Sequence, residues 1–418
     1  MSSLLGRSLR AAGLAVAACL AAPAWAAPEG MATRPTYEDL IARLDQMPAA
    51  IEARALSEAA DARARQARAL LNPSIAVGVD NAYGSGPYAG RNSAEDSLAL
   101  IQPLELWGKR GARIAVADAA AGAAGLRGEQ RRWMTAAVLA QAYSLAEARV
   151  RRYDLSAEAL SLIEADARAI DALVREGRQP KLRSIQAQSE VEAARAALDE
   201  AGALKSGALA RLGAVALADQ PLEGVGNSLL ERVPATLPAT TGEPLAVRIA
   251  EADLATASRQ IKVEKRRALT DVSASVGARR FRATDERAMN IGLTLSVPLF
   301  DRNRGNISAA YAEERAAEAR LLAQRQQVQA DRLAAQAALA ASNTRTRAAD
   351  SGVTAAEEAY RLARVGFDAG RISQLELRSA RTALISARNV AVDARMSRVL
   401  AEIELAQLEG RAPFVETP

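Results

Sequence analysis

The side chains that usually perform chemistry are scarce in this sequence. It has no histidine, one cysteine (Cys19) and six methionines. Catalysis by Ser-His or Cys-His pairs and ligation of zinc or copper by histidine are therefore excluded. Carboxylates are plentiful, but they alternate with arginine at helical spacing, as on solvated helix faces. We expect a protein that is not an enzyme and has no cofactor and no metal site of its own.

Glycine and proline landmarks recur at nearly one spacing and indicate an internal duplication. Pro103 and Pro298 each follow an alternating strand and precede a charged, glycine-containing stretch, and they lie 195 residues apart (298 − 103). Gly177 and Gly370 each end a long helical run, and they lie 193 residues apart (370 − 177). Two unrelated landmarks with almost the same offset predict two repeats that cover nearly the whole chain.

Each repeat is predicted to contain the same order of elements. A first helix spans roughly 37–70 or 244–268. Two strands follow, and then come a very long helix and a return helix. The predicted strands are 74–80, 96–102, 271–279 and 289–297. The predicted long helices are 112–175 and 305–368, and the return helices are 181–212 and 374–409. We place the first repeat at 27–230 and the second at 231–418, with residues 213–243 as the linker.

The strand at 290–297 alternates without a break. Ile291 and Leu293 belong to an aliphatic face, whereas Asn290 and Thr294 belong to a face of small polar groups. Such a face pattern is typical of a membrane barrel wall, but four strands are too few to close one. A homo-oligomer would supply eight strands from two chains or twelve from three. Aromatic residues flank the strands where a membrane interface would favour them. They are Tyr83, Tyr88, Trp107 and Phe300.

The N-terminus has the pattern of a secretory signal peptide, which we place at 1–26. Arg7 and Arg10 precede the apolar stretch 11–22, and Ala24–Ala26 form a small-residue cleavage site. Cys19 is either apolar filler that is cut away or a lipidated cysteine at a lipoprotein cleavage site. No later stretch has about 18 consecutive apolar residues. The net charge of +5 is spread along the chain, so nucleic-acid binding is not expected.

This layout resembles the TolC family of outer-membrane channels. The stretches QPLELWGKRGAR and PLFDRNRGNI, where strand passes into helix, resemble its heavy-metal-efflux (CzcC-like) branch. The residues at these two junctions are Pro103, Glu105, Lys109, Arg110, Gly111, Pro298, Asp301, Arg302, Asn303 and Gly305. The resemblance implies a mainly α fold with a small antiparallel β part. It also implies a homotrimer that forms a 12-stranded outer-membrane β-barrel, in contact with lipid, and continues as a periplasmic α-helical barrel.

The resemblance also implies partners and a gate. A periplasmic adaptor protein and a proton-driven inner-membrane pump would complete the assembly. Its adaptor would contact the hairpin tips, which contain Gly177, Arg178, Gly370 and Arg371. An acidic residue that narrows the tunnel would correspond to Glu376, with Arg183 and Arg378 beside it. Glu376 also fits a helix capping box with Ser373, so it serves the cap, the constriction or both.

The predicted function is a passive exit duct of a tripartite efflux pump, with divalent heavy-metal cations as cargo. One alternative keeps the fold and changes the cargo to drugs or secreted polypeptides, as in type I secretion. The other alternative is a soluble periplasmic coiled-coil adaptor, which would have no membrane-facing strands.

Overall fold

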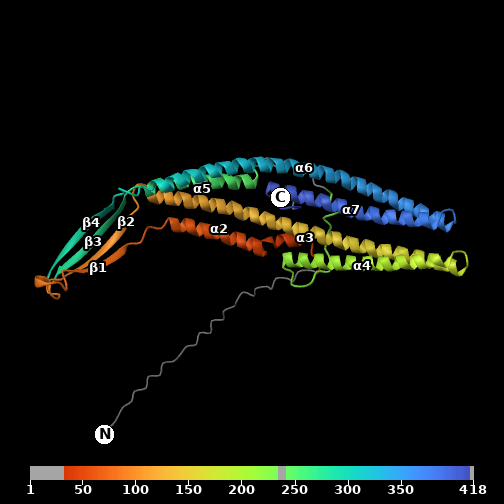
Figure 1. The fold of residues 1–418 in the computed structure, drawn as a ribbon, viewed down its shortest axis with the longest axis horizontal. Helices are drawn as coiled ribbons and strands as arrows, with labels where there is room; N and C mark the ends of the chain where they lie inside the picture. Colours follow the sequence, from red (N-terminus) through yellow and green to blue (C-terminus); the bar gives the residue numbers. More distant parts are fainter. Residues whose placement is uncertain (1–32, 234–241, 415–418) are drawn as a thin grey trace, which may run out of the picture.

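The computed structural model describes residues 33–233 and 242–414, so the predicted signal peptide and Cys19 lie outside the described residues. The molecule is elongated, with a small sheet at one end and the turns of two helical hairpins at the other (Figure 1). The first repeat forms α1 (Tyr37–Ala42), η1 (Leu44–Gln46), α2 (Pro48–Ala67), β1 (Ser74–Asp80), η2 (Gly86–Tyr88), β2 (Glu95–Leu104), α3 (Lys109–Arg175) and α4 (Lys181–Ala216). The second repeat forms α5 (Leu245–Arg267), β3 (Asp271–Phe281), β4 (Glu286–Ser296), α6 (Arg304–Asp368) and α7 (Gln374–Glu409). The predicted class, mainly helical with a small antiparallel sheet, is confirmed.

The first helix of the chain is interrupted, which the single predicted helix at 37–70 did not anticipate. A capping box of Thr36 and Asp39 starts α1, and α2 begins only at Pro48. Met47 is extended (φ −71°, ψ 142°) because the proline ring that follows it disfavours helical backbone. Pro48 itself is well placed at the first position of α2, where its missing N–H costs nothing.

The four strands form one antiparallel sheet in the order β1-β2-β3-β4. The central pairing joins the two repeats, with Leu100 opposite Val276. Pro103 does not end its strand as predicted, because β2 continues through Pro103 to Leu104. The proline is tolerated there because β1 stops at Ser74, opposite Ile101, and leaves that side of β2 without a partner strand. Pro298, in contrast, follows the end of β4.

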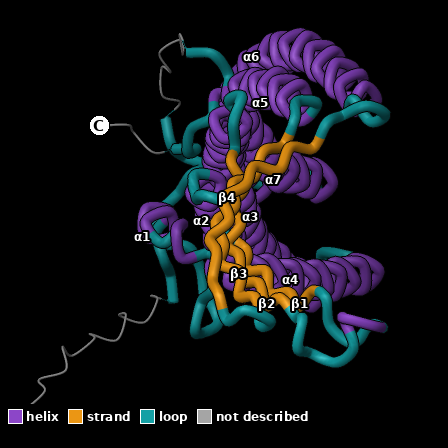
Figure 2. The backbone as a smooth tube through the Cα atoms, turned by 90° about the vertical axis from the view of Figure 1, so that its left-hand side faces the viewer, coloured by secondary structure: helices purple, strands orange, loops and turns teal. Residues whose placement is uncertain are grey.

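Two long helices carry the rest of the fold. With 67 residues in α3 and 65 in α6, each is about 100 Å long at 1.5 Å per residue. Each folds back on its return helix, α3 with α4 and α6 with α7, while α2 and α5 lie beside them (Figures 1 and 2). Alanine supplies many of the buried positions, which lets neighbouring helices pack closely over this length.

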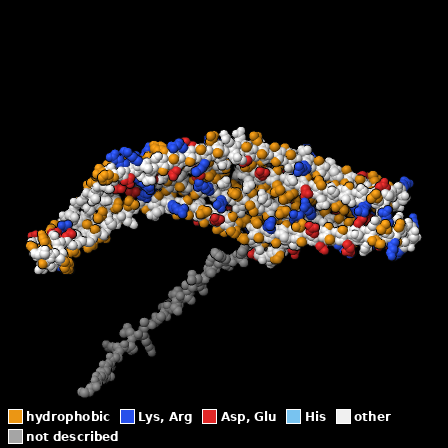
Figure 3. All heavy atoms as spheres, in the orientation of Figure 1, with side chains coloured by type: hydrophobic (Ala, Val, Ile, Leu, Met, Phe, Trp, Pro, Cys, Tyr) orange, Lys and Arg blue, Asp and Glu red, His pale blue; other side chains and the backbone are white. Residues whose placement is uncertain are grey.

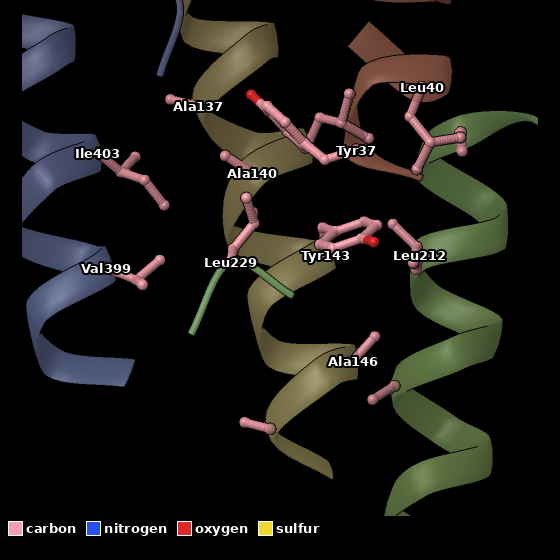
Figure 4. Packing of buried hydrophobic residues seen from close by; sticks show 14 of the residues in the cluster. Tyr37, Leu40, Ala137, Ala140, Tyr143, Ala146, Leu212, Leu229, Val399 and Ile403 are labelled. Carbon is pink, nitrogen blue, oxygen red and sulfur yellow. The ribbon is translucent and has the colours of Figure 1, made fainter. Parts of the chain in front are cut away.

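The main core lies where the hairpins, α1 and the linker meet. Tyr37 and Tyr143 are fully buried, with their rings 5.8 Å apart in an edge-to-face contact (Figure 4). Each hydroxyl has a partner, since Tyr37 donates to the carbonyl of Pro413 at 3.0 Å and Tyr143 donates to that of Asn227 at 2.8 Å. The linker and the C-terminal segment are thereby fixed to α1 and α3.

Candidate functional site

The register of the sheet separates two chemically different faces. We call the first the aliphatic face; it contains Ile75, Val77, Leu98, Leu100, Val276, Ile291, Leu293 and Leu295. We call the other the small-residue face; it contains Ala76, Gly78, Ser97, Ala99, Ser273, Ser275, Gly277, Asn290, Gly292 and Thr294. Ile101 and Phe281 are larger apolar residues on the small-residue face.

The aliphatic face is open to the surroundings in the single chain. Ile291 is 85% exposed and Val77 is 76% exposed, far more than expected for aliphatic residues that face water. On the opposite face, Gly277 is required for space, because a Cβ there would lie 2.8 Å from the carbonyl oxygen of Leu98 and 2.5 Å from Oδ1 of Asn290. The sheet therefore offers one apolar surface and one surface of short side chains.

The first strand-to-helix junction is held by long cationic side chains. Lys109 donates from Nζ to the Leu269 carbonyl at 2.6 Å and to the Asp271 carboxylate at 2.7 Å. Arg110 donates to the Arg68 carbonyl at 2.6 Å. These bonds satisfy backbone carbonyls beyond α2 and α5, where a positive charge also complements the helix dipole.

Arg113 belongs to this junction, although the sequence analysis did not select it. Its guanidinium donates to the Ala67 carbonyl at 2.6 Å and forms a bidentate ion pair with Glu105 at 2.5 and 3.0 Å. The sequence feature that indicates Arg113 is its position four residues after Lys109, which places both side chains on one side of the first turn of α3.

The second junction uses an amide in place of the cations. Asn303 donates from Nδ2 to the Glu264 carbonyl and carboxylate, both at 2.9 Å, and its own N–H donates to Asp301 at 2.9 Å. Asn303 is also the N-cap of α6, with φ 56°. The predicted junction from Asp301 to Gly305 thus turns at Asn303, because Gly305 already lies in α6. Arg302 precedes this turn and is exposed.

The corresponding turn in the first repeat is made by Trp107 and Gly108. Their φ angles are 60° and 76°, in the left-handed region. Gly111, which belonged to the predicted junction, is the third residue of α3. Trp107 adds a hydrogen bond from its indole N–H to the Thr270 carbonyl at 3.1 Å, which ties the turn to the start of β3.

The two hairpin tips have the same construction. Gly177 and Gly370 are left-handed, with φ 73° and 67°. The N–H of Arg178 donates to the Leu173 carbonyl at 2.9 Å, and the N–H of Arg371 donates to the Gly366 carbonyl at 2.8 Å. This is the Schellman ending, in which a glycine closes the helix.

Glu376 lies in the first turn of α7 and completes the predicted capping box. The N–H of Ser373 donates to its carboxylate at 2.7 Å, and the N–H of Glu376 donates to the Ser373 hydroxyl at 3.3 Å. The bonds from Ser373 hold the pKa of Glu376 below its usual value. Within the described ranges no ion pair joins it to Arg183 or Arg378; Arg378 instead binds Glu190 at 2.9 Å.

A buried charge cluster, which the sequence analysis missed, joins the two hairpins near their tips. Asp166 of α3 pairs with Arg381 of α7 and with Arg364 of α6 at 3.0 Å. Arg381 also binds Glu190 of α4 at 2.9 Å. Asp166 and Arg381 are 8% and 5% exposed, so the pair is largely removed from water. All four helices thus meet in one ionic network, which fixes one hairpin on the other.

The described residues contain no helix apolar and long enough to cross a bilayer. The same part of the chain has no group of three or more His, Cys, Asp or Glu side chains placed to hold a metal ion.

The fold and the two-faced sheet define a class of outer-membrane channel. The sequence profile described as "Outer membrane efflux protein" matches residues 43–216 and 242–411, and the chain belongs to this family. The family resemblance inferred from the sequence is confirmed, and with it the location in the outer membrane. The family is one of channels that work in tripartite efflux systems.

Particular relatives refine this assignment. The nickel-cobalt-cadmium resistance protein NccC of Alcaligenes xylosoxydans xylosoxydans is 39% identical over 293 residues, which are 69% of this chain and 67% of NccC. The nickel and cobalt resistance protein CnrC of Cupriavidus metallidurans is 38% identical, over 69% of this chain and 70% of CnrC. A membrane protein from Pseudomonas aeruginosa has the same fold, with a TM-score of 0.77, 21% identity and 90% of both chains covered.

Proposed function

We propose that this chain is the outer-membrane exit duct of a tripartite pump that expels divalent heavy-metal cations. The observation that carries the proposal is the two-faced sheet at one end of paired helical hairpins. An aliphatic face fits contact with lipid, and a face of small groups fits a water-filled passage. Tyr83, Trp107 and Phe300 at the ends of the sheet fit the two membrane interfaces.

Closure of the channel requires more than one chain. Four strands cannot enclose a passage, and three copies supply twelve, so we propose a homotrimer. Residues 27–230 and 231–418 would then be two versions of one unit, each providing a strand pair and a helical hairpin. The unpaired edges of β1 and β4 would pair between copies, which removes the free sheet edges.

The cargo is proposed from the relatives. NccC and CnrC are resistance proteins for nickel, cobalt and, for NccC, cadmium. The described part of the chain has no metal-binding cluster, so we propose that cations pass without being bound and that selection lies in the inner-membrane pump. The tips around Gly177, Arg178, Gly370 and Arg371 would meet a periplasmic adaptor, and the pump would be driven by protons.

Function is tested in a host that keeps its metal-efflux adaptor and pump but lacks their outer-membrane component. Expression of this chain should restore growth in nickel, cobalt or cadmium, and the purified trimer should form conducting pores in planar bilayers. Restored resistance to organic drugs alone would favour the drug-efflux alternative. A water-soluble protein without pores would favour the periplasmic adaptor alternative.

We propose further that Glu376 contributes to a constriction inside the tips. Its carboxylate is exposed and ionised at neutral pH, as a cation-attracting ring requires. Glu376→Gln keeps a hydrogen-bonding group in the cap and removes the charge, so cation selectivity and block by divalent cations should both weaken in planar bilayers. Glu358→Gln, an exposed carboxylate of α6, is the control. Unchanged selectivity in Glu376→Gln would leave the residue with a capping role only.

A further inference from the structure

The charges at the end of the sheet farthest from the helices are sorted by face. The loops 81–94 and 282–285 close the two strand pairs at this end (Figure 1), where both basic and acidic side chains reach the surface (Figure 3). Five arginines and five carboxylates lie in these loops and the adjoining strand ends, so their formal charges cancel. They are Asp80, Arg91, Glu95, Asp96, Arg279, Arg280, Arg282, Asp285, Glu286 and Arg287.

The aliphatic side of this end is positively charged. Asp96, Arg280 and Arg287 lie in one cross-strand row on that face. Arg282 and Arg91 reach Asp96 from the same side, at 2.7 and 3.8 Å, while Asp285 pairs with Arg280. Four arginines thus face two aspartates, a net charge of +2 (4 − 2).

The small-residue side carries the opposite charge. Arg279 binds Glu95 at 2.8 Å and reaches Asp80 at 3.8 Å, and Glu286 lies in the same cross-strand row as these two acids. The net charge there is −2 (1 − 3). Because neighbouring residues of a strand point to opposite faces, Arg279 and Arg280 differ in surroundings although they are adjacent in sequence.

The aliphatic side also holds two like charges directly opposite each other. Arg280 of β3 and Arg287 of β4 are register partners, an arrangement that destabilises a sheet unless an anion lies between the side chains. Asp285 binds Arg280 and also interacts electrostatically with Arg287, but Arg287 has no ion pair within 4.0 Å among the described residues. Each guanidinium has five donors, so Arg280 also retains free donors beyond its bonds to Asp285.

We propose that Arg91, Arg280, Arg282 and Arg287, here called the arginine rim, bind the phosphate groups of lipid headgroups in the outer leaflet. The inference rests on the proposed function, in which the aliphatic face contacts lipid. Ala278 and Met289 share a cross-strand row of the aliphatic face with Leu98, and Arg280 and Arg287 lie two residues nearer the loops. That is about 7 Å along the strands, which is headgroup level when the apolar band is in hydrocarbon. Guanidinium groups form bidentate hydrogen bonds with phosphate oxygens, and one phosphate can bridge Arg280 and Arg287.

The test compares lipid binding by the intact assembly and by variants. The solubilised trimer is titrated with lipid A carrying its phosphates or with dephosphorylated lipid A, and bound lipid is counted by native mass spectrometry. Wild type should bind the phosphorylated form more tightly. Arg280→Gln with Arg287→Gln should weaken that binding about 25-fold, or roughly fivefold for each arginine removed near an anionic surface.

The matched control is Arg279→Gln, which removes the neighbouring arginine on the small-residue face and should leave the affinity unchanged. Replacing Arg280 and Arg287 by lysine should keep part of the affinity, which separates charge from folding. Equal binding of the two lipid forms, or equal binding by wild type and the double variant, would overturn the proposal. Displacement of lipid A by inorganic phosphate at equal concentration would mean that the arginine rim binds a free anion and not a lipid headgroup.

Bilayer conductance distinguishes a failure of this inference from a failure of the proposed function. A trimer that inserts and conducts but does not bind lipid phosphate contradicts only the proposal about the arginine rim. A chain that neither inserts nor conducts contradicts the channel assignment and the rim together.

Discussion

Individual charges in the helical part are stabilised by partners on other elements. Asp166 and Arg381 are the clearest pair, because both are buried and they belong to different hairpins. The carboxylate would be costly to bury alone, and two guanidinium groups offset that cost. We therefore expect the pair to favour one arrangement of the hairpins rather than to add much net stability.

Replacing Arg381 tests how far the fold depends on pairing the buried Asp166. In Arg381→Ala, Asp166 keeps only the half-exposed Arg364, and the free energy of unfolding should fall by about 3 kcal/mol in urea titrations. The control is Arg361→Ala, which breaks the exposed pair with Glu358 and should leave the free energy of unfolding nearly unchanged, because water and salt screen that pair. Similar losses in the two variants would mean that the buried pair has no special role.

Glu147 is a second buried charge, and it fixes the linker to α3. Its carboxylate accepts hydrogen bonds from the Ser228 hydroxyl and from the N–H groups of Leu229 and Leu230, at 2.8 and 3.2 Å for the latter two. Burial nevertheless raises the pKa of Glu147 above its ordinary value of 4.5, because desolvation outweighs these bonds.

The raised pKa predicts a pH dependence of stability. The folded state binds the proton more tightly than the unfolded state, so this contribution is greatest below about pH 4.5 and is lost as pH rises through the folded pKa. Between pH 4.5 and 7, the urea midpoint of wild type should fall relative to that of Glu147→Gln. A difference between the two proteins that stays constant over this range would rule out titration of Glu147.

At the scale of elements, glycine has two different roles in the long helices. Gly370 ends α6 in a left-handed conformation, whereas Gly352 lies within α6 with open space around its Cα. The first position needs glycine because a Cβ is strained at φ 67°. At position 352, glycine only lowers the stability of the helix.

Alanine at these two positions should therefore act in opposite directions. Gly370→Ala should lower the free energy of unfolding by about 1 kcal/mol through backbone strain. Gly352→Ala should raise it by up to about 1 kcal/mol through helix propensity. Urea unfolding of the two variants provides the comparison, and a shift of the same sign in both would contradict the assignment of the tip.

At the scale of the whole molecule, the two faces of the sheet should tolerate charge unequally. Leu293→Arg places a charge on the proposed lipid face and should cost about 2–4 kcal/mol near the membrane midplane. Thr294→Arg places it on the passage side, next to water. The yield of folded trimer in lipid vesicles should fall strongly for Leu293→Arg and little for Thr294→Arg. Equal yields would mean that the faces are misassigned.

The sequence was sufficient for features that depend on local pattern. Alternation marked β4, glycine and proline marked the hairpin tips, and Ser373 with Glu376 marked a cap. Each of these is set by residues a few positions apart, whose backbone preferences need no distant partner. Local pattern failed at Pro103, because tolerance of proline within a strand depends on where the neighbouring strand ends.

The sequence by itself determined the duplicated order of elements, the mainly helical class and the family, because periodicity and turn residues record them directly. Only the tertiary structure decided that β2 pairs with β3, that Arg113 and Asn303 hold the junctions, and that Asp166 meets Arg381. These contacts join residues as many as 215 positions apart. No local pattern specifies them, since they depend on how the long helices and the sheet are placed in space.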